Sequence, residues 1–303
     1  MADPGRLGAS LPAAAVVYRH RRMTSPAPDE PTTDLLLPAI TFRELTRVED
    51  IRLVQDMERR VWAYEDIDLS PVPLVIALVK SGALLLGAFD GGTLRGFALS
   101  VPGDRHQQRM HWSHMTGVDA ALRSSGLGTR LKLEQARRVA ARGYRRIQWT
   151  YDPLQSLNAH LNLVKLGGRA DEYIEHVYGD STSALHRGAP TDRFVITWDL
   201  TEDGTPVRSA RVAQARAGTA ADAGIVDTRA DWDRYVPAAT LPETAVVRVP
   251  VPARFSAMLQ AAPGLATQWR LATRAQFQAL FARGYEAVAF ERDDERGAYL
   301  LVR

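Results

Sequence analysis

Apolar positions follow helical spacing in some stretches between residues 40 and 200 and strand spacing in others. The spacing of Ile51, Val54, Met57 and Val61 predicts a helix over Val48–Trp62. Similar patterns and glycine stops predict further helices over Val72–Ser81, Gly126–Arg142 and Ser156–Leu166. Short apolar runs predict strands over Ile40–Leu45, Ala83–Phe89, Leu94–Val101, His111–Val118, Ile147–Tyr151 and Phe194–Leu200. Strands interspersed with helices predict an α/β fold built on a mixed (α+β) sheet.

The same patterns predict how the chain is divided. Residues 1–38 are rich in Ala, Pro and Ser without periodicity, which indicates a disordered tail or a mis-assigned start, with Met23 as another beginning. Residues 39–201 form the predicted main domain, and 202–227 form a predicted linker. Residues 228–303 predict a small C-terminal α/β unit with strands Ala245–Val251, Ala287–Phe290 and Tyr299–Val302 and a helix around Ala275–Arg283.

Composition excludes several classes of protein. The chain has 303 residues, of which 46% are hydrophobic and 24% charged, as in ordinary globular proteins. It has no cysteine, so disulfides, thiolate metal sites and a cysteine nucleophile are excluded. No apolar run approaches the ~18 residues that cross a bilayer, and the basic cluster near the start follows its apolar stretch instead of preceding it. We therefore expect a cytoplasmic protein without a membrane partner.

Positive charge is concentrated in one segment. The formal net charge is +3, but Leu122–Arg146 alone contains eight basic residues and one acidic residue. Within it, Arg123-Ser-Ser-Gly126-Leu-Gly128 follows the predicted strand His111–Val118 and opens the long helix. Glycines there let an anion approach the backbone, where the unpaired N–H groups of the first helical turn point at it. The Rossmann and Walker A patterns do not match this loop.

The arrangement Arg123-x-x-Gly126-x-Gly128 resembles the Arg/Gln-x-x-Gly-x-Gly/Ala acyl-CoA loop of the GNAT superfamily of N-acyltransferases. The resemblance covers about residues 40–200, where the predicted order of elements is also the GNAT order. Runs such as Ser113–Asp119, Trp149–Leu154 and Thr191–Phe194 resemble a poorly characterised group of predicted acetyltransferases. Members of that group have a C-terminal extension similar to Trp269–Arg274 and Arg283–Tyr285.

The resemblance implies a site for acetyl-CoA or another acyl-CoA. Its pantetheine arm would lie in a gap between the strand ending at Val118 and the strand Ile147–Tyr151, and its diphosphate on the glycine loop. No metal is implied. The implied cofactor-binding residues are Thr116, Gly117, Val118, Arg123, Ser124, Ser125, Gly126, Leu127, Gly128, Thr129 and Asn158.

The implied reaction is direct attack of an amine on the thioester, without a covalent enzyme intermediate. Freeing an alkyl amine with a pKa of about 10.4 from its proton at pH 7 costs about 4 to 5 kcal/mol, so a base is wanted. His114 is the first candidate, since strand alternation places it with Trp112, Thr116 and Val118 and opposite His111, Ser113 and Met115. A structural histidine is the alternative, and Asp152 and Asp119 are further candidates that also suit turn capping.

The leaving thiolate and the acceptor leave more alternatives open. GNAT enzymes often protonate the thiolate with a tyrosine, but Leu163 stands at the matching position, so either Tyr151 supplies the proton or none is needed. Trp112, Asn162 and Arg193 are candidate substrate-binding residues, with core packing as the alternative for the aromatic side chain. His111 and His114 point to opposite strand faces under this alternation, which disfavours a metal pair.

Three functions follow from these observations. The first is an N-acyltransferase that moves an acetyl or succinyl group to a small amine such as an amino acid. The second is a non-catalytic acyl-CoA sensor, suggested by the missing tyrosine. The third, disfavoured, is nucleic-acid binding through the basic helix. The C-terminal unit could cover the acceptor, form a homodimer, or merely pack.

Overall fold

The computed structural model describes residues 39–179, 189–227, 234–293 and 296–303. Contacts divide the chain into two units, Met1–Asp34 and Leu35–Arg303, and every described residue belongs to the second. The predicted tail, 1–38, lies outside the described residues.

The first part of this unit follows the predicted order of elements. It comprises β1 (Ile40–Glu44), α1 (Val48–Trp62), the 3₁₀ turn η1 (Asp66–Asp68), α2 (Val72–Lys80), β2 (Leu84–Asp90), β3 (Thr93–Arg105), β4 (Gln108–Val118), the 3₁₀ turn η2 (Ala120–Leu122), α3 (Leu127–Ala141), β5 (Arg146–Tyr151), α4 (Ser156–Ala159), the π-helical turn η3 (His160–Lys165), β6 (Arg169–Ile174) and β7 (Arg193–Leu200). The strand β6 was not predicted, because its charged sequence shows no apolar alternation.

The second part adds strands to the same sheet. It comprises β8 (Pro206–Val207), α5 (Arg211–Ala217), β9 (Ala221–Asp222), β10 (Gly224–Asp227), β11 (Arg234–Pro237), β12 (Val246–Pro252), α6 (Phe255–Ala261), α7 (Pro263–Ala282), β13 (Glu286–Arg292) and β14 (Arg296–Val302). The segment expected as a linker, 202–227, thus carries β8, α5, β9 and β10. Val212 and Ala215 of α5 pack against residues of β13 and β14.

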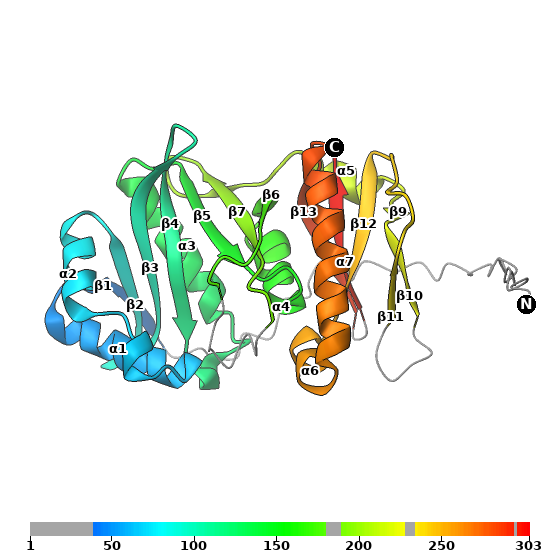
Figure 1. Ribbon diagram of the computed structural model, residues 1–303. Coiled ribbons are helices and arrows are strands. Elements are labelled where there is room, and N and C mark those ends of the chain that lie inside the picture. The colour runs from blue at the N-terminus through cyan, green and yellow to red at the C-terminus, as the bar shows by residue number, and fades with distance from the viewer. Residues whose placement is uncertain (1–38, 180–188, 228–233, 294–295) are drawn as a thin grey trace, which may run out of the picture. The chain divides into compact units, whose positions relative to one another are not determined.

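The mixed α/β fold is confirmed by the sheet. Within the described residues, one sheet runs in the order β1-β2-β3-β4-β5-β7-β6-β13-β14-β12-β9, with β8 beside β7. Most neighbours are antiparallel, but β4 with β5 and β9 with β12 are parallel. The pairing of Ala170 with Ala287 joins β6 to β13, so the strands of both parts form one continuous sheet (Figure 1).

Helices cover both faces of the sheet. One core lies between the sheet and the helices α1 and α2, with Ile51, Val54 and Met57 fully or almost fully buried. The other core includes Leu127, Leu131 and Val139 of α3 and continues to residues of α6 and α7. Figure 1 shows α7 running beside the strands β13 and β12. In the described part of the chain, no helix combines the length and apolar character needed to cross a bilayer.

The strands β4 and β5 separate along their length. Their parallel pairing consists of His111 with Ile147 and Trp112 with Gln148. Beyond these pairs β4 continues to Val118 and β5 to Tyr151. The gap predicted between these two strands is therefore present, and α3 begins at its open end.

A β-bulge in β4 corrects the predicted alternation. Ser100 of β3 pairs with Ser113, and the preceding Leu99 pairs with Met115, so His114 is an extra residue without a partner in β3. The bulge shifts the side-chain alternation by one residue. Ser113 therefore contacts α3, on the same face as the later Thr116 and Val118, whereas the prediction placed Ser113 on the opposite face.

Candidate functional site

A glycine loop forms the entrance to α3. Gly126 is the residue before the helix and has a φ of +87°, a left-handed conformation that glycine adopts without steric cost. Ser125 Oγ donates to the carbonyl of Leu122 at 2.7 Å and holds the loop closed. The first-turn N–H groups of α3, including those of Gly128 and Thr129, have no acceptor within the helix. Together with the helix dipole, which is equivalent to about half a positive charge, they favour an anion here.

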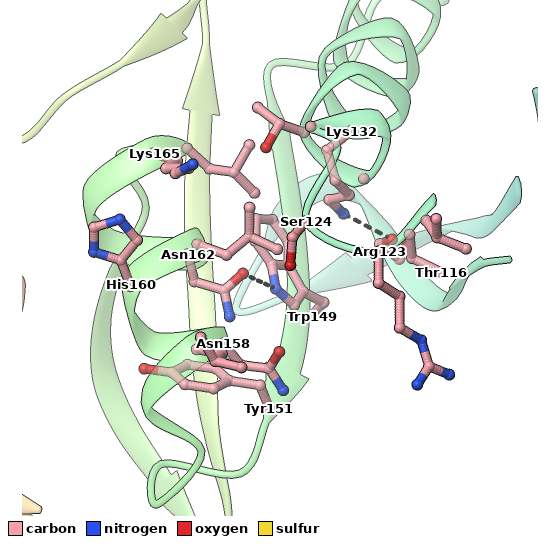
Figure 2. Close-up of a pocket in the computed structure, with 18 of the residues that line it drawn as sticks. Thr116, Arg123, Ser124, Lys132, Trp149, Tyr151, Asn158, His160, Asn162 and Lys165 are labelled. Carbon is pink, nitrogen blue, oxygen red and sulfur yellow. Dashed lines mark hydrogen bonds between the residues drawn. The ribbon is translucent and has the colours of Figure 1, made fainter. Parts of the chain in front are cut away.

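A cavity of about 860 Å³ opens between β4, β5, the start of α3 and the α4–η3 segment (Figure 2). Its lining includes many of the predicted site residues: His114, Thr116, Val118, Arg123, Ser124, Gly126, Gly128, Thr129, Tyr151, Asn158 and Asn162. The structure thus brings together the predicted base, the loop and the two asparagines. The cavity wall also contains four cationic side chains, which are Arg123, Lys132, Lys165 and Arg292. Among the described residues, no Asp or Glu lines it.

Five predicted residues are not part of the cavity wall. Gly117 is covered by Phe97 and Trp62. A Cβ on Gly117 would lie 2.9 Å from the Phe97 ring. Leu127 is buried in the hydrophobic core, and Ser125 Oγ bonds back to the loop. Trp112 pairs with Val101 in the sheet, and the buried Arg193 donates to the Asp192 carbonyl at 2.9 Å. The predicted substrate-binding roles of Trp112 and Arg193 are therefore not supported by this cavity.

His114 is an exposed residue on the cavity wall, in the bulge of β4. Desolvation by the surrounding protein lowers the pKa of His114, and the negative charge of Glu58 opposes this shift. With the pKa below 6.5, the ring is mostly neutral at pH 7 and able to accept a proton.

Glu58 is a buried carboxylate that sequence reasoning missed. It is 0% exposed and accepts hydrogen bonds from Ser70 N at 2.9 Å and Ser70 Oγ at 2.7 Å. The signal was available, because Glu58 lies seven residues after Ile51 and four after Val54, on the apolar face of α1. An acidic residue at a core position of a helix indicates a specific partner.

Lys132 is the second missed residue and the most buried cation of the wall. It is 4% exposed, and its Nζ donates to Ser113 Oγ at 2.9 Å and Gln135 Oε1 at 2.8 Å. The same Nζ lies 3.9 Å from the centroid of the Trp149 ring. Desolvation lowers the pKa of Lys132 to about 7. Its position one turn after Gly128 on the inward face of α3 was again visible in the sequence.

Tyr151 and Asn162 are tied to other side chains. The Tyr299 hydroxyl donates to the Pro153 carbonyl at 2.7 Å, so the Tyr151 hydroxyl is the donor in its 3.0 Å hydrogen bond to Tyr299. Burial raises the pKa of Tyr151 well above its ordinary value. Asn162 Oδ1 accepts from Trp149 Nε1 at 3.2 Å, as Figure 2 shows, and so fixes the indole in the wall. Asn158, four residues earlier, is exposed in the cavity.

Asp152 and Asp119, the other candidate bases, serve as structural groups. Asp152 accepts two hydrogen bonds from Arg270 at 2.7 Å each and one from Leu154 N at 2.9 Å. Burial alone would raise the pKa of Asp152, but the charge and hydrogen bonds of Arg270 hold it below its usual value. Asp119 Oδ1 accepts from Ala121 N at 3.1 Å, as an N-cap of the turn η2. The turn-capping alternative therefore describes both residues.

Metal ligands are not gathered here. His111 is buried against Ser100 Oγ, at 3.0 Å from its Nδ1, whereas His114 faces the cavity. Over the described ranges, no group of three or more His, Asp or Glu side chains is close enough to hold a metal ion.

Comparison with solved structures finds acetyltransferases, and the three named here each match just over half of the chain. The ribosomal-protein-S18-alanine N-acetyltransferase from Escherichia coli is 16% identical, with a TM-score of 0.43, over 56% of this chain and 96% of that chain. A GNAT family acetyltransferase from Elizabethkingia anophelis with acetyl-CoA bound is 16% identical, with a TM-score of 0.42, over 53% of this chain and 98% of that chain. An aminoglycoside 6′-acetyltransferase type Ii is 20% identical, with a TM-score of 0.42, over 52% of this chain and 96% of that chain. No protein-family model and no curated protein sequence matches the chain.

Proposed function

We propose that this protein is an acyl-CoA-dependent N-acyltransferase of the GNAT type, acting on the amine of a small molecule such as an amino acid. The observation that carries the proposal is the charge of the cavity. Four cationic side chains and the start of a helix surround it, and no described carboxylate lines it. Coenzyme A carries a diphosphate and a 3′-phosphate, so its charge complements this wall.

Each part of coenzyme A has a matching part of the cavity. The diphosphate would accept from the first-turn amides of α3, near Gly126 and Gly128, with Arg123 at the rim. The pantetheine arm would run in the gap between β4 and β5, where main-chain groups around Thr116 have no partner strand on the β5 side. Arg292, which reaches the cavity from β13, would contribute a further cation for phosphate.

The proposed reaction is a direct transfer. The amine nitrogen attacks the thioester carbonyl carbon, a C–N bond forms, and the C–S bond then breaks to release coenzyme A as its thiolate. The proton lost by the amine passes to His114, which is neutral at pH 7 and stands in the bulge of β4. Tyr151 is not assigned as the acid, because its hydroxyl proton is donated to Tyr299. The thiolate therefore leaves without a proton from Tyr151.

Two measurements on the full chain test the function. Calorimetric titration should show binding of coenzyme A, and thiol release from acetyl-CoA should accelerate in the presence of at least one amine of an amino-acid panel. Absence of coenzyme A binding would overturn the proposal. Tight binding without turnover on any amine would support a non-catalytic sensor instead of an enzyme. The buried Leu163 and the Tyr151 hydroxyl, which already donates to Tyr299, would then explain the absence of catalysis.

A further inference from the structure

The ammonium group of Lys132 closes the inner end of the gap between β4 and β5. The last paired residues of these strands are Trp112 and Gln148. The next residue is Ser113 on β4 and Trp149 on β5, and both contact Lys132 Nζ. The glycine loop follows the end of β4 at Val118, five residues or about 16 Å beyond Ser113, so it lies at the outer end of the gap. A ligand with its phosphates on the loop and its arm along the gap would have its far end beside Lys132.

This ammonium group has only neutral partners. Its hydrogen-bond acceptors are the Ser113 hydroxyl and the Gln135 amide oxygen. Among the described residues, no Asp or Glu bonds to it, and burial without any carboxylate contribution lowers its pKa. A buried charge without a counter-charge is unfavourable, and an anionic group that entered the gap would remove this penalty.

The surrounding groups suit a carboxylate. Gln135 Nε2 is buried without a hydrogen-bond partner, next to the amide oxygen that already accepts from Lys132. Trp149, held by Asn162, forms an apolar wall for a short carbon chain. A carboxylate at the end of such a chain would accept from Lys132 Nζ at the closed end of the gap.

We propose that Lys132 selects acyl-CoA donors whose acyl group ends in a carboxylate, such as the succinyl group. This inference rests on the proposed function, because it places the acyl end of the donor in the gap. The glycine loop, Arg123 and Arg292 would contact only the coenzyme A part of the donor, so they leave the acyl group open. The inference about Lys132 adds the class of acyl group.

Affinity measurements with donors of equal length test the inference. Coenzyme A, butyryl-CoA and succinyl-CoA are titrated into the full chain near pH 7, since the last two differ only in a terminal methyl or carboxylate. We expect succinyl-CoA to bind about tenfold tighter than butyryl-CoA or better, the size of a charge-assisted hydrogen bond. Equal affinity of the two thioesters, or tighter binding of butyryl-CoA, would overturn the inference while coenzyme A binding still supported the proposed function. Absence of binding by all three would overturn both.

Substitutions assign the preference to one side chain. In Lys132→Met, the ratio of the succinyl-CoA affinity to the butyryl-CoA affinity should fall to about one, and any loss of affinity for coenzyme A should be matched by butyryl-CoA. Arg130→Met is the matched control, because it removes the same charge from α3 at a position outside the cavity wall, and it should keep the preference. A preference that persists in Lys132→Met would overturn the assignment. So would loss of turnover with an unchanged affinity ratio, which indicates a role in proton transfer instead.

Discussion

Replacing Lys132 by methionine should stabilise the protein, and the gain should depend on pH. The ammonium group is 4% exposed and has no described counter-charge, so folding removes it from water with incomplete compensation. Methionine fills a similar volume without a charge. Because Lys132 lies on the wall of the candidate site, this experiment also measures how much a buried cation at the site lowers the free energy of unfolding.

The pKa of Lys132 determines how much Lys132→Met changes the free energy of unfolding. It is about 7 in the folded protein, compared with 10.5 for a solvated lysine, so the unfolded chain binds more protons between these two values. The stability of the wild-type protein therefore rises with pH through this window. The linked penalty on folding is about 5 kcal/mol at pH 6 and about 2 kcal/mol at pH 9. The stabilising effect of Lys132→Met should accordingly shrink by about 3 kcal/mol between these two pH values.

Urea denaturation of both proteins from pH 6 to pH 9 measures this difference, and all other titrating groups cancel in the comparison. Loss of the hydrogen bonds to Ser113 and Gln135 lowers the gain by about 1 to 2 kcal/mol at every pH, so the slope is the decisive quantity. Arg130→Met, which removes a partly exposed cation from the same helix, should give no slope. Parallel stability curves for wild type and Lys132→Met would show that folding does not lower the pKa of Lys132.

Three further outcomes are expected. Gly128→Val should abolish coenzyme A binding in a titration yet keep the fold by circular dichroism, because its φ is not left-handed and its new Cβ meets Val118 at an ordinary 3.7 Å; unchanged affinity would remove the loop from the site. Asp152→Asn should lower the free energy of unfolding, measured by urea denaturation, by about 3 to 5 kcal/mol, because the buried Arg270, 2% exposed, would lose its counter-charge. The double variant Asp152→Asn with Arg270→Met should recover most of the lost stability. His114→Gln should lower kcat about 100-fold and remove the fall of the rate as pH drops through the lowered pKa of His114, and an unaltered pH–rate profile would exclude it as the base.

Local patterns predicted most helices and strands of residues 39–201 well because these elements bury one face each. The spacing of Ile51, Val54 and Met57 is enough to place α1, and glycine at position 126 marks the start of α3. The glycine loop is the part of the candidate site that depends on such local signals. This is why it could be located before the structure was known.

Tertiary contacts decided what could not be predicted. The bulge at His114 arises from the register between β3 and β4, and it puts Ser113, before the bulge, on the same face as Thr116 and Val118, after it. The strand β6 has the sequence Arg-Ala-Asp-Glu-Tyr-Ile and is a strand because it lies between β7 and β13. The buried charges of Glu58 and Lys132 did interrupt apolar helix faces, and such interruptions are the sequence signal that would have found them.

A crystal structure of the protein with coenzyme A bound tests the proposed function most directly. We expect the diphosphate at the start of α3, within hydrogen-bond distance of main-chain N–H groups between Ser124 and Thr129, and the thiol in the gap between β4 and β5. A diphosphate bound at any other place on the protein would contradict it.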